Sequence, residues 1–352
     1  MRRARCTPSN LTELKTLRTT VGSALRSTLG KERTRAIRKR ERRFRRKLAR
    51  KIAPPKAVKV LPPEEPEVEV AVPDVPVVEI LPVDGEPHWR PSDPSAVFAP
   101  PRLSRHELLG ELHRLLAPRT YLEIGVNDGA SLTLSRTRSI AVDPEFAISY
   151  PLHCDLALVQ ATSDEFFAGD APCAHFNGVP IDLAFIDGMH LSEFAYRDFM
   201  NTEHHMSPAG VVLLDDMLPR NSLEAARDRM TSSWTGDVYK VVAALQDTRP
   251  DLVVIPVNTA PTGTLIVLGL DPASKTLSES YEDLLPGFLS ADPQSVPEGL
   301  LHRTVAVSVE DLLDLPLWGE LRRLRETAPS EPLQRETFAA LDALPRETLV
   351  EP

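Results

Sequence analysis

Residues 121–131 read YLEIGVNDGAS, and the rest of the chain is best understood from this segment outward. The run 121–124 predicts a short buried strand, Gly125 and Gly129 predict a turn, and a helix is expected to begin near Ser131. Glycines let a ligand approach the backbone closely, and the N-terminus of a helix presents N–H groups that have no partner within the helix. The segment therefore predicts a binding site for a nucleotide-like ligand.

A second strand is predicted at residues 139–143, and it ends in a carboxylate, Asp143. In parallel sheets of this kind such a carboxylate accepts hydrogen bonds from the hydroxyl groups of a ribose. The glycine spacing is not that of the dinucleotide fingerprint, G-x-G-x-x-G, because the run that starts at Glu123 reads E-x-G-x-x-x-G. An NAD-binding dehydrogenase is therefore the weakest of the alternatives.

Strand and helix patterns alternate through the region 102–272. A helix is predicted from Ser104, a favourable N-cap residue, to Leu116. Further strands are predicted at 120–125, 156–160, 181–187, 210–216, 252–257 and 264–269, and further helices at 191–204, 222–230 and 238–245. The near-continuous apolar runs suit strands that helices bury on both faces. The region predicts an α/β fold with a doubly wound, mostly parallel sheet, in which the short link between the last two strands makes that pair antiparallel.

The two flanks differ from this core in composition. The net charge of −9 conceals a basic arm, residues 1–52, in which residues 1–51 hold 19 Lys and Arg against 3 Asp and Glu. We expect the arm to be partly helical, and either solvated or bound to an anionic partner such as nucleic acid or an acidic membrane. Residues 53–101, rich in Pro, Glu and Val, predict a disordered linker. Residues 273–352 predict a helical C-terminal extension that covers the core, caps the site or joins a homo-oligomer.

Cysteine use and hydropathy indicate the compartment. Cys6, Cys154 and Cys173 are scattered and form no C-x-x-C pair, which fits a reducing compartment. No apolar run approaches the roughly 18 residues of a membrane span. The N-terminal region also lacks the apolar segment of a secretory signal. We therefore expect a cytoplasmic protein.

Carboxylates follow several of the predicted parallel strands, at the edge where such sheets bind their ligands. The third strand is followed by Ser163 and Asp164, the fourth by Asp187 and His190, and the fifth ends in Asp215 and Asp216. Crowded carboxylates repel one another unless a cation lies among them. Asp187, Asp215 and Asp216 are therefore a candidate metal site, and Mg²⁺ is the expected ion because oxygen ligands suit hard cations. The alternatives are that Asp216 is a turn residue and that His190 is a surface residue.

The run E-x-G-x-x-x-G resembles motif I of class I S-adenosylmethionine (SAM)-dependent methyltransferases. The run D-G-x-H from Asp187 and the run S-P-x-G-V-V-L-L-D-D from Ser207 resemble the family that includes macrocin O-methyltransferase and cephalosporin hydroxylase-like proteins, and more distantly catechol O-methyltransferase. The resemblance covers about residues 104–270. It implies a seven-stranded, Rossmann-like class I methyltransferase sheet in the order 3-2-1-4-5-7-6.

The resemblance also implies roles for the residues at the strand ends. SAM is expected to contact the glycine turn and the ends of the second and third strands, through Glu123, Gly125, Asn127, Gly129, Ser131, Asp143, Ser163 and Asp164. Asp187, Asp215 and Asp216 are expected to hold a divalent metal that orients the acceptor hydroxyl. Catalysis is expected to rest on His190, as the general base, together with Asp187.

The sequence therefore predicts a SAM-dependent O-methyltransferase, assisted by Mg²⁺, that methylates a hydroxyl group of a small molecule such as a sugar, a glycoside or a secondary metabolite. One alternative is a catalytically weak binding module of the same fold, which arm 1–52 would tether to an anionic polymer or membrane. Another is an RNA methyltransferase, which is disfavoured because the chain beyond the arm is strongly acidic and would repel a phosphate backbone.

Overall fold

The structure is a computed structural model, and it describes residues 101–327 together with residues 335, 336 and 339. The predicted basic arm lies outside the described residues, and so does all of the predicted linker except residue 101. Among the described helices, none is both long and apolar enough to cross a membrane.

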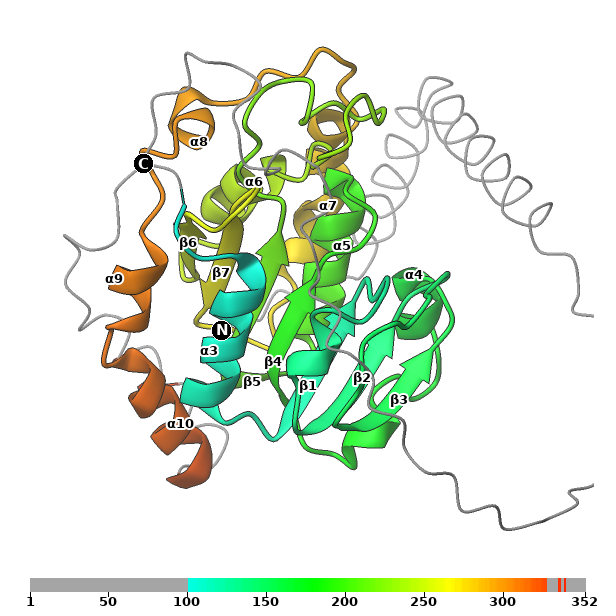
Figure 1. The fold of residues 1–352 in the computed structure, drawn as a ribbon, viewed down its shortest axis with the longest axis vertical. Helices are drawn as coiled ribbons and strands as arrows, with labels where there is room; N and C mark the ends of the chain where they lie inside the picture. The colour runs from blue at the N-terminus through cyan, green and yellow to red at the C-terminus, as the bar shows by residue number, and fades with distance from the viewer. Residues whose placement is uncertain (1–100, 328–334, 337–338, 340–352) are drawn as a thin grey trace, which may run out of the picture. The chain divides into compact units, whose positions relative to one another are not determined.

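Seven strands form one sheet in the order β3-β2-β1-β4-β5-β7-β6 (Figure 1). In chain order the strands are β1 (Thr120–Ile124), β2 (Arg138–Val142), β3 (Asp155–Val159), β4 (Ile181–Ile186), β5 (Met206–Asp215), β6 (Val253–Val257) and β7 (Thr264–Leu268). All neighbours from β3 to β5 pair in parallel, whereas β7 is antiparallel to both β5 and β6. The predicted fold class and the predicted strand order are confirmed.

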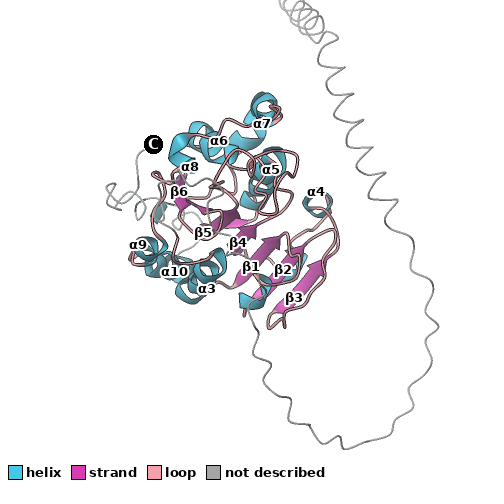
Figure 2. Cartoon of the chain, turned by 45° about the horizontal axis from the view of Figure 1, so that its top comes forward, coloured by secondary structure: helices cyan, strands magenta, loops and turns pink. Residues whose placement is uncertain are grey.

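Helices cover both faces of this sheet (Figure 2). The described helices are α3 (Arg105–Leu116), α4 (Ser163–Phe167), α5 (Ser192–Glu203), α6 (Lys240–Thr248), α7 (Thr276–Phe288), α8 (Glu298–Leu301), α9 (Val309–Leu313) and α10 (Leu317–Thr327). Successive strand residues point to opposite faces, so neighbouring residues of β5 join different halves of the core. Leu214 packs with the layer of α5, α6 and α7, and Leu213 packs with the layer of α3, α9 and α10.

The start of α3 follows the sequence prediction. Ser104 is the N-cap, its hydroxyl accepts a hydrogen bond from Glu107 N, and the Glu107 carboxylate accepts one from Ser104 N. This reciprocal capping box satisfies donors that the first helical turn would leave unpaired. Because the cap fixes where α3 begins, it also fixes the position of Arg105, the first residue of the helix.

The helix expected near Ser131 is wrong. Residues Leu132–Leu134 form a single turn of 3-10 helix, and the chain enters β2 at Arg138. The segment is short and alternates Ser and Thr with other residues, and these side chains compete for backbone hydrogen bonds that a helix would use. The glycine turn is therefore not followed by an α-helix whose N-terminus could receive an anion.

The helix predicted at residues 222–230 is also wrong, because the segment consists of turns and bends. Its polar side chains make buried ion pairs instead. Arg220 pairs with Glu224, and Arg227 pairs with Glu193 and Asp237. These contacts come partly from distant elements, and they outweigh the local helical pattern.

The C-terminal extension is helical, as predicted, and its described part covers the core. Trp318, Leu321 and Leu324 of α10 are almost fully buried and pack with α3 and with one face of the sheet. Figure 1 shows α9 and α10 running beside α3 on that face. Of the three roles left open by the sequence, this is the one the described residues support.

Candidate active site

The glycine turn after β1 uses most of its backbone N–H groups within the protein. Gly125 N donates to Val142 O, Gly129 N donates to Val126 O, and Ala130 N donates to the Asp128 carboxylate. Gly125 and Gly129 have φ angles of 87° and 86°, which favour glycine. At Gly125 a Cβ atom would come 1.8 Å from the carbonyl oxygen of Asp187, so this turn lies directly against the end of β4.

Asp143, at the end of β2, holds the glycine turn. Its Oδ2 accepts hydrogen bonds from Val126 N (2.8 Å) and Asn127 N (2.9 Å), and its Oδ1 accepts one from Glu145 N (2.7 Å). A carboxylate has about four acceptor positions, so one remains for a further donor such as a ribose hydroxyl. Asn127 itself adopts a left-handed conformation, with φ of 49°.

Glu123 lies underneath the turn and is fully buried. Its carboxyl group accepts hydrogen bonds from the Tyr121 hydroxyl (2.6 Å) and the Ser131 hydroxyl (2.7 Å). Burial raises the pKa of Glu123 to about 8, although the two hydrogen bonds oppose this rise. Glu123 and Ser131 are thus paired with each other in the structure, and Glu123 supports the turn from below through side chains.

Ser163 and Asp164 begin α4, beside α5. The Asp164 carboxylate accepts two hydrogen bonds from Arg197, at 3.0 and 2.6 Å. Ser163 lies near the buried Asp198, whose pKa is raised to about 7 by burial, while a hydrogen bond from Ser163 opposes the rise. Both predicted residues therefore belong to a polar group that joins α4 and α5.

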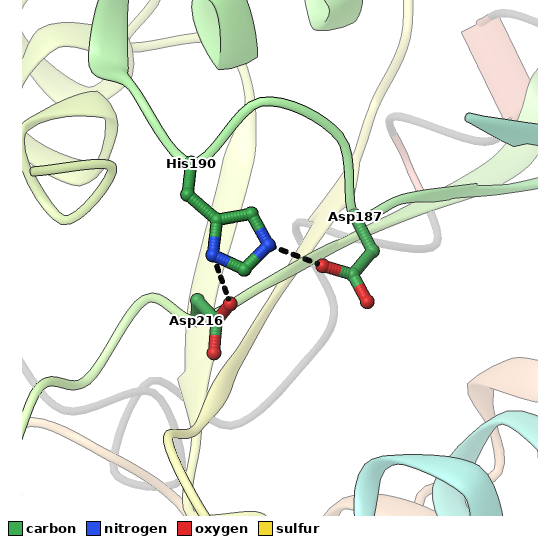
Figure 3. Close-up of side chains that lie close together, drawn as sticks. All are labelled: Asp187, His190 and Asp216. Carbon is green, nitrogen blue, oxygen red and sulfur yellow. Dashed lines mark hydrogen bonds and ion pairs between the residues drawn. The ribbon is translucent and has the colours of Figure 1, made fainter. Parts of the chain in front are cut away.

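His190 lies between two carboxylates, as Figure 3 shows. Its Nε2 is 3.0 Å from Asp187 Oδ1, and its Nδ1 is 2.9 Å from Asp216 Oδ2. One ligand atom from each of these three residues lies within 4.8 Å of the others. His190 and Asp216 both have positive φ, 54° and 64°, a conformation that non-glycine residues adopt only when their surroundings impose it.

The charges of this cluster support one another. Burial alone would lower the pKa of His190, but the charges of Asp216 and Asp187 and the hydrogen bonds to them raise this pKa well above its ordinary value. Burial would raise the pKa of Asp187, and the contact with His190 lowers it. In this arrangement the protonated form of His190 is favoured, and its single positive charge offsets part of the charge of the two carboxylates.

Asp215 does not join the cluster. Its Oδ2 forms an ion pair with Nε of Arg105, at 3.0 Å, and the Asp215 side chain is almost fully buried. Burial raises the pKa of Asp215, an effect that Arg105 opposes. Of the three predicted metal ligands, the structure brings Asp187 and Asp216 together with His190 as the third member, and it directs Asp215 toward α3.

The segment between β5 and α6 holds His190 from the other side. The carbonyl oxygen of Trp234 lies 2.9 Å from His190 Nδ1, and the two rings are stacked. Gly236 packs so closely on the His190 carbonyl oxygen that a Cβ atom would come within 1.7 Å of it. Thr262, from the loop before β7, donates a hydrogen bond to Asp216. These contacts fix the imidazole ring relative to both carboxylates.

A small cavity adjoins the cluster. Asp187, His190, Asp215 and Asp216 line it together with apolar residues such as Met217 and Val238. Its volume of about 10 Å³ is close to the space that one water-sized sphere occupies. The space suits a single ion or water molecule beside the polar wall, and it is too small for an organic acceptor.

The donor set fits a divalent metal. Two carboxylates and an imidazole nitrogen are a known kind of ligand set for divalent cations, and the left-over imidazole N–H can be held by the Trp234 carbonyl oxygen. An imidazole ligand shifts the preference from Mg²⁺ toward Mn²⁺, Fe²⁺ or Zn²⁺, because Mg²⁺ prefers oxygen. The predicted ion, Mg²⁺, is therefore not the only one that these residues suit.

Three residues of the site were not singled out in the sequence: Arg105, Trp234 and Thr262. Arg105 follows a recognisable N-cap and is the first residue of the helix that leads into β1, so its position at the start of α3 could be predicted, although its partner could not. Trp234 and Thr262 come from loops whose course depends on long-range contacts, and no local signal marks them.

A comparison with known proteins agrees with the prediction of a methyltransferase domain. Residues 122–217 match the family model described as a methyltransferase domain, which confirms that prediction for these residues. The finer resemblance to the macrocin O-methyltransferase family stays a prediction. No curated protein sequence matches the chain.

Several solved structures resemble the chain at low sequence identity. The O-methyltransferase TomG from Streptomyces achromogenes, solved with SAM, is 20% identical, and the match covers 47% of this chain and 78% of TomG with a TM-score of 0.33. The Podospora anserina methyltransferase PaMTH1, solved with S-adenosylhomocysteine (SAH), is 14% identical, and the match covers 47% of this chain and 77% of PaMTH1 with a TM-score of 0.34. An O-methyltransferase from Bacillus cereus, also solved with SAH, is 15% identical, and the match covers 49% of this chain and 82% of that protein with a TM-score of 0.32. What each of these proteins binds is a property of that protein.

Proposed function

We propose that this chain is a SAM-dependent O-methyltransferase that acts on a hydroxyl group of a small molecule and uses a divalent metal bound at the cluster of Asp187, His190 and Asp216. The observation that carries the proposal is the arrangement of one sheet edge. The glycine turn after β1, the carboxylate of Asp143 after β2 and the acidic cluster after β4 and β5 lie on four neighbouring strands. The methyltransferase-domain match over residues 122–217 supports the same reaction class.

The residues of β1 and β2 would bind the cofactor. SAM supplies an electrophilic methyl group on a sulfonium, so the chemistry of the leaving group belongs to the cofactor. Asp143 keeps the glycine turn in place through Val126 N and Asn127 N, and it has one acceptor position left for a ribose hydroxyl. Gly125 leaves the surface of the turn without a side chain beside the end of β4.

The residues of β4 and β5 would bind and orient the acceptor hydroxyl. A divalent cation held there would lower the pKa of that hydroxyl and position it. Asp187 and Asp216 supply carboxylate ligands, and Trp234 and Thr262 keep His190 and Asp216 from rotating away. The protein would thus contribute mainly alignment of the acceptor with the methyl group.

The role of His190 depends on whether a metal is bound. Between two carboxylates the doubly protonated imidazole is favoured, because the pKa of His190 is raised well above its ordinary value, and this form cannot accept a proton from the acceptor. A metal ion bound by Asp187 and Asp216 would weaken the hold of both carboxylates on that proton. His190 would then be neutral, and it would serve either as the third ligand or as the general base that was predicted from the sequence.

The proposal is tested by calorimetry followed by a transfer assay. SAM and SAH are titrated into the full chain, with and without EDTA, and labelled SAM is then offered with a panel of catechols, glycosides and other hydroxylated small molecules. We expect SAM to bind with and without EDTA, and methyl transfer to stop when EDTA is added. No binding of SAM at millimolar concentration would overturn the proposal. Binding with no transfer to any member of the panel, with or without added metal, would favour the catalytically weak binding module instead.

A further inference from the structure

Among the described residues, the glycine turn and the segment after it offer no evident partner for the negative group at the charged end of the proposed cofactor. SAM carries a sulfonium, an ammonium and a carboxylate, and an enzyme must satisfy all three or leave them in water. The start of a helix after the glycine turn was the expected anion site, but only one 3-10 turn is present. The N–H groups of the turn itself are largely used within the protein, at Gly125, Val126, Asn127, Gly129 and Ala130.

Arg105 is a cation at the same edge of the sheet, and some of its N–H donors have no hydrogen-bond partner among the described residues. Its Nε lies 3.0 Å from Asp215 Oδ2, an ion pair without the geometry of a hydrogen bond, and this contact keeps the guanidinium beside the end of β5. The two terminal NH₂ groups have no hydrogen-bond partner among the residues that the structure describes, and 28% of the side chain is exposed. The ion pair therefore holds the guanidinium in place while its outer side remains open to a ligand.

Helix α3 carries Arg105 along the glycine turn. Leu108 and Leu112 of α3 share one apolar cluster with Val126 and Leu132, which lie three residues before and three residues after Gly129. Charges from both sides act on the guanidinium: the pKa of Arg105 is raised by Asp215 first, and then by Asp187, Asp216 and Asp128, with burial opposing. Asp128 belongs to the turn, so the guanidinium lies between the turn and the acidic cluster.

The charge balance of this edge suits a ligand with a net positive charge and a single carboxylate. Asp128, Asp143 and the acidic cluster would attract the sulfonium and ammonium of SAM and would repel an acceptor whose only charge is negative. Arg105 offers the fork of donors that matches a carboxylate. Since this argument depends on SAM as the ligand, it rests on the proposed function.

We propose that Arg105 binds the carboxylate of the methionine part of SAM through its terminal NH₂ groups, while Asp215 holds its Nε. Asp215 then has a positioning role: the residue predicted as a metal ligand instead orients a cofactor-binding arginine. Neither residue would take part in the chemistry of the methyl group.

The test compares SAM with decarboxylated SAM, which lacks only the carboxylate. Both are titrated by calorimetry into the wild-type chain, Arg105→Gln, Arg105→Lys and Arg114→Gln. Arg114 is the control because it lies on the same helix, is exposed and pairs only with Glu111 among the described residues. We expect wild type and Arg114→Gln to prefer SAM, and Arg105→Gln to lose about 10–100-fold in affinity for SAM while its affinity for decarboxylated SAM stays near that of the wild type. Arg105→Lys keeps the charge without the fork and should fall between them.

Arg105→Gln leaves Asp215 buried without its partner, so folding is controlled separately. The double variant Arg105→Gln/Asp215→Asn removes both charges, and it should show the same loss of preference for SAM with a thermal unfolding temperature near that of the wild type. If the ratio of the affinities for SAM and decarboxylated SAM is unchanged in both variants, the inference is overturned and the proposed function stands. This outcome includes the case in which Arg105 binds a carboxylate of the acceptor. Equal losses for the two ligands would overturn it as well. Failure of the wild-type chain to bind either ligand would overturn the proposed function itself.

Discussion

The imidazole ring of His190 stacks on the indole ring of Trp234, with centroids 5.3 Å apart and planes inclined by 17°. The backbone carbonyl oxygen of Trp234 also lies 2.9 Å from His190 Nδ1, and it accepts a hydrogen bond from that nitrogen when the nitrogen is protonated. Trp234 thus contacts His190 through both its side chain and its backbone. The indole is itself fixed, because Nε1 donates to Ala226 O at 2.6 Å.

Replacement of Trp234 should therefore act on the metal site from outside the ligand set. We expect Trp234→Ala to weaken the binding of Mn²⁺ by about 10–100-fold, the usual effect of removing a group that orients a ligand. Trp234→Phe keeps an aromatic face on His190 and should recover most of this loss. Manganese binding measured by electron paramagnetic resonance would check both. Equal metal affinity in wild type and Trp234→Ala would contradict a positioning role.

The two neighbouring aspartates at the end of β5 should differ in their effect on the metal. Asp216 belongs to the cluster with His190, so Asp216→Asn should weaken Mn²⁺ binding by at least about tenfold. Asp215→Asn should leave metal affinity near that of the wild type, because Asp215 pairs with Arg105. Titrations of Mg²⁺, Mn²⁺ and Zn²⁺ into the two variants would measure this difference, and a larger loss in Asp215→Asn would restore the ligand set predicted from the sequence.

The different directions of the Asp215 and Asp216 side chains could have been predicted from the alternation of side chains along a strand. Val211, Leu213 and Asp215 lie two residues apart, so they share the face that packs on α3. Asp216 is the next residue, so its side chain must point away from that face. The resemblance to a known motif treated the pair as one unit, and this is why the metal set included Asp215 and omitted His190 as a ligand.

The fold could be predicted because its signals are local. Apolar runs mark the strands, and the carboxylates at the ends of neighbouring parallel strands meet at one edge whatever the loops do. The helix expected at 222–230 could not be excluded in this way, because the residue that decides its course, Arg227, pairs with Glu193 and Asp237 from other parts of the chain. Trp234 is held by the same segment, because its indole Nε1 donates to Ala226 O, next to Arg227.

Gly125 should tolerate no side chain. A Cβ atom there would lie 1.8 Å from the Asp187 carbonyl oxygen, and backbone hydrogen bonds to the neighbouring strands, Gly125 N to Val142 O and Asp187 N to Ile124 O, hold both residues in place. Gly178 is a matched control, because it has a similar φ of 79° but no atom within 4 Å of a Cβ. We expect Gly178→Ala to cost about 1–2 kcal/mol, the strain of a left-handed residue, and Gly125→Ala to cost at least about 1–3 kcal/mol more through the clash. Urea unfolding would compare them, and equal losses would show that the turn can relax.

Glu123 should make the stability of the domain depend on pH. Burial raises its pKa to about 8 in the folded chain, above its value of about 4.5 when exposed. Between these values the folded state keeps a proton that the unfolded state releases, so this contribution to stability is fully present below about pH 4.5 and is lost as the pH rises through about 8. Because the group is fully buried, the change should amount to a few kcal/mol.

Glu123→Gln removes the titration while it keeps a group of the same shape between Tyr121 and Ser131. The variant should therefore lose less stability than the wild type between about pH 5 and about pH 8, when both are unfolded by urea at each pH. Glu111→Gln, on the exposed face of α3, is the control and should follow the wild type. Other titrating groups, such as the half-buried His113 with its pKa lowered to about 4 by burial and by Arg136, act equally on all three proteins. If Glu123→Gln and wild type lose the same stability over this range, Glu123 is ionised in the folded chain, and its hydrogen bonds outweigh its burial.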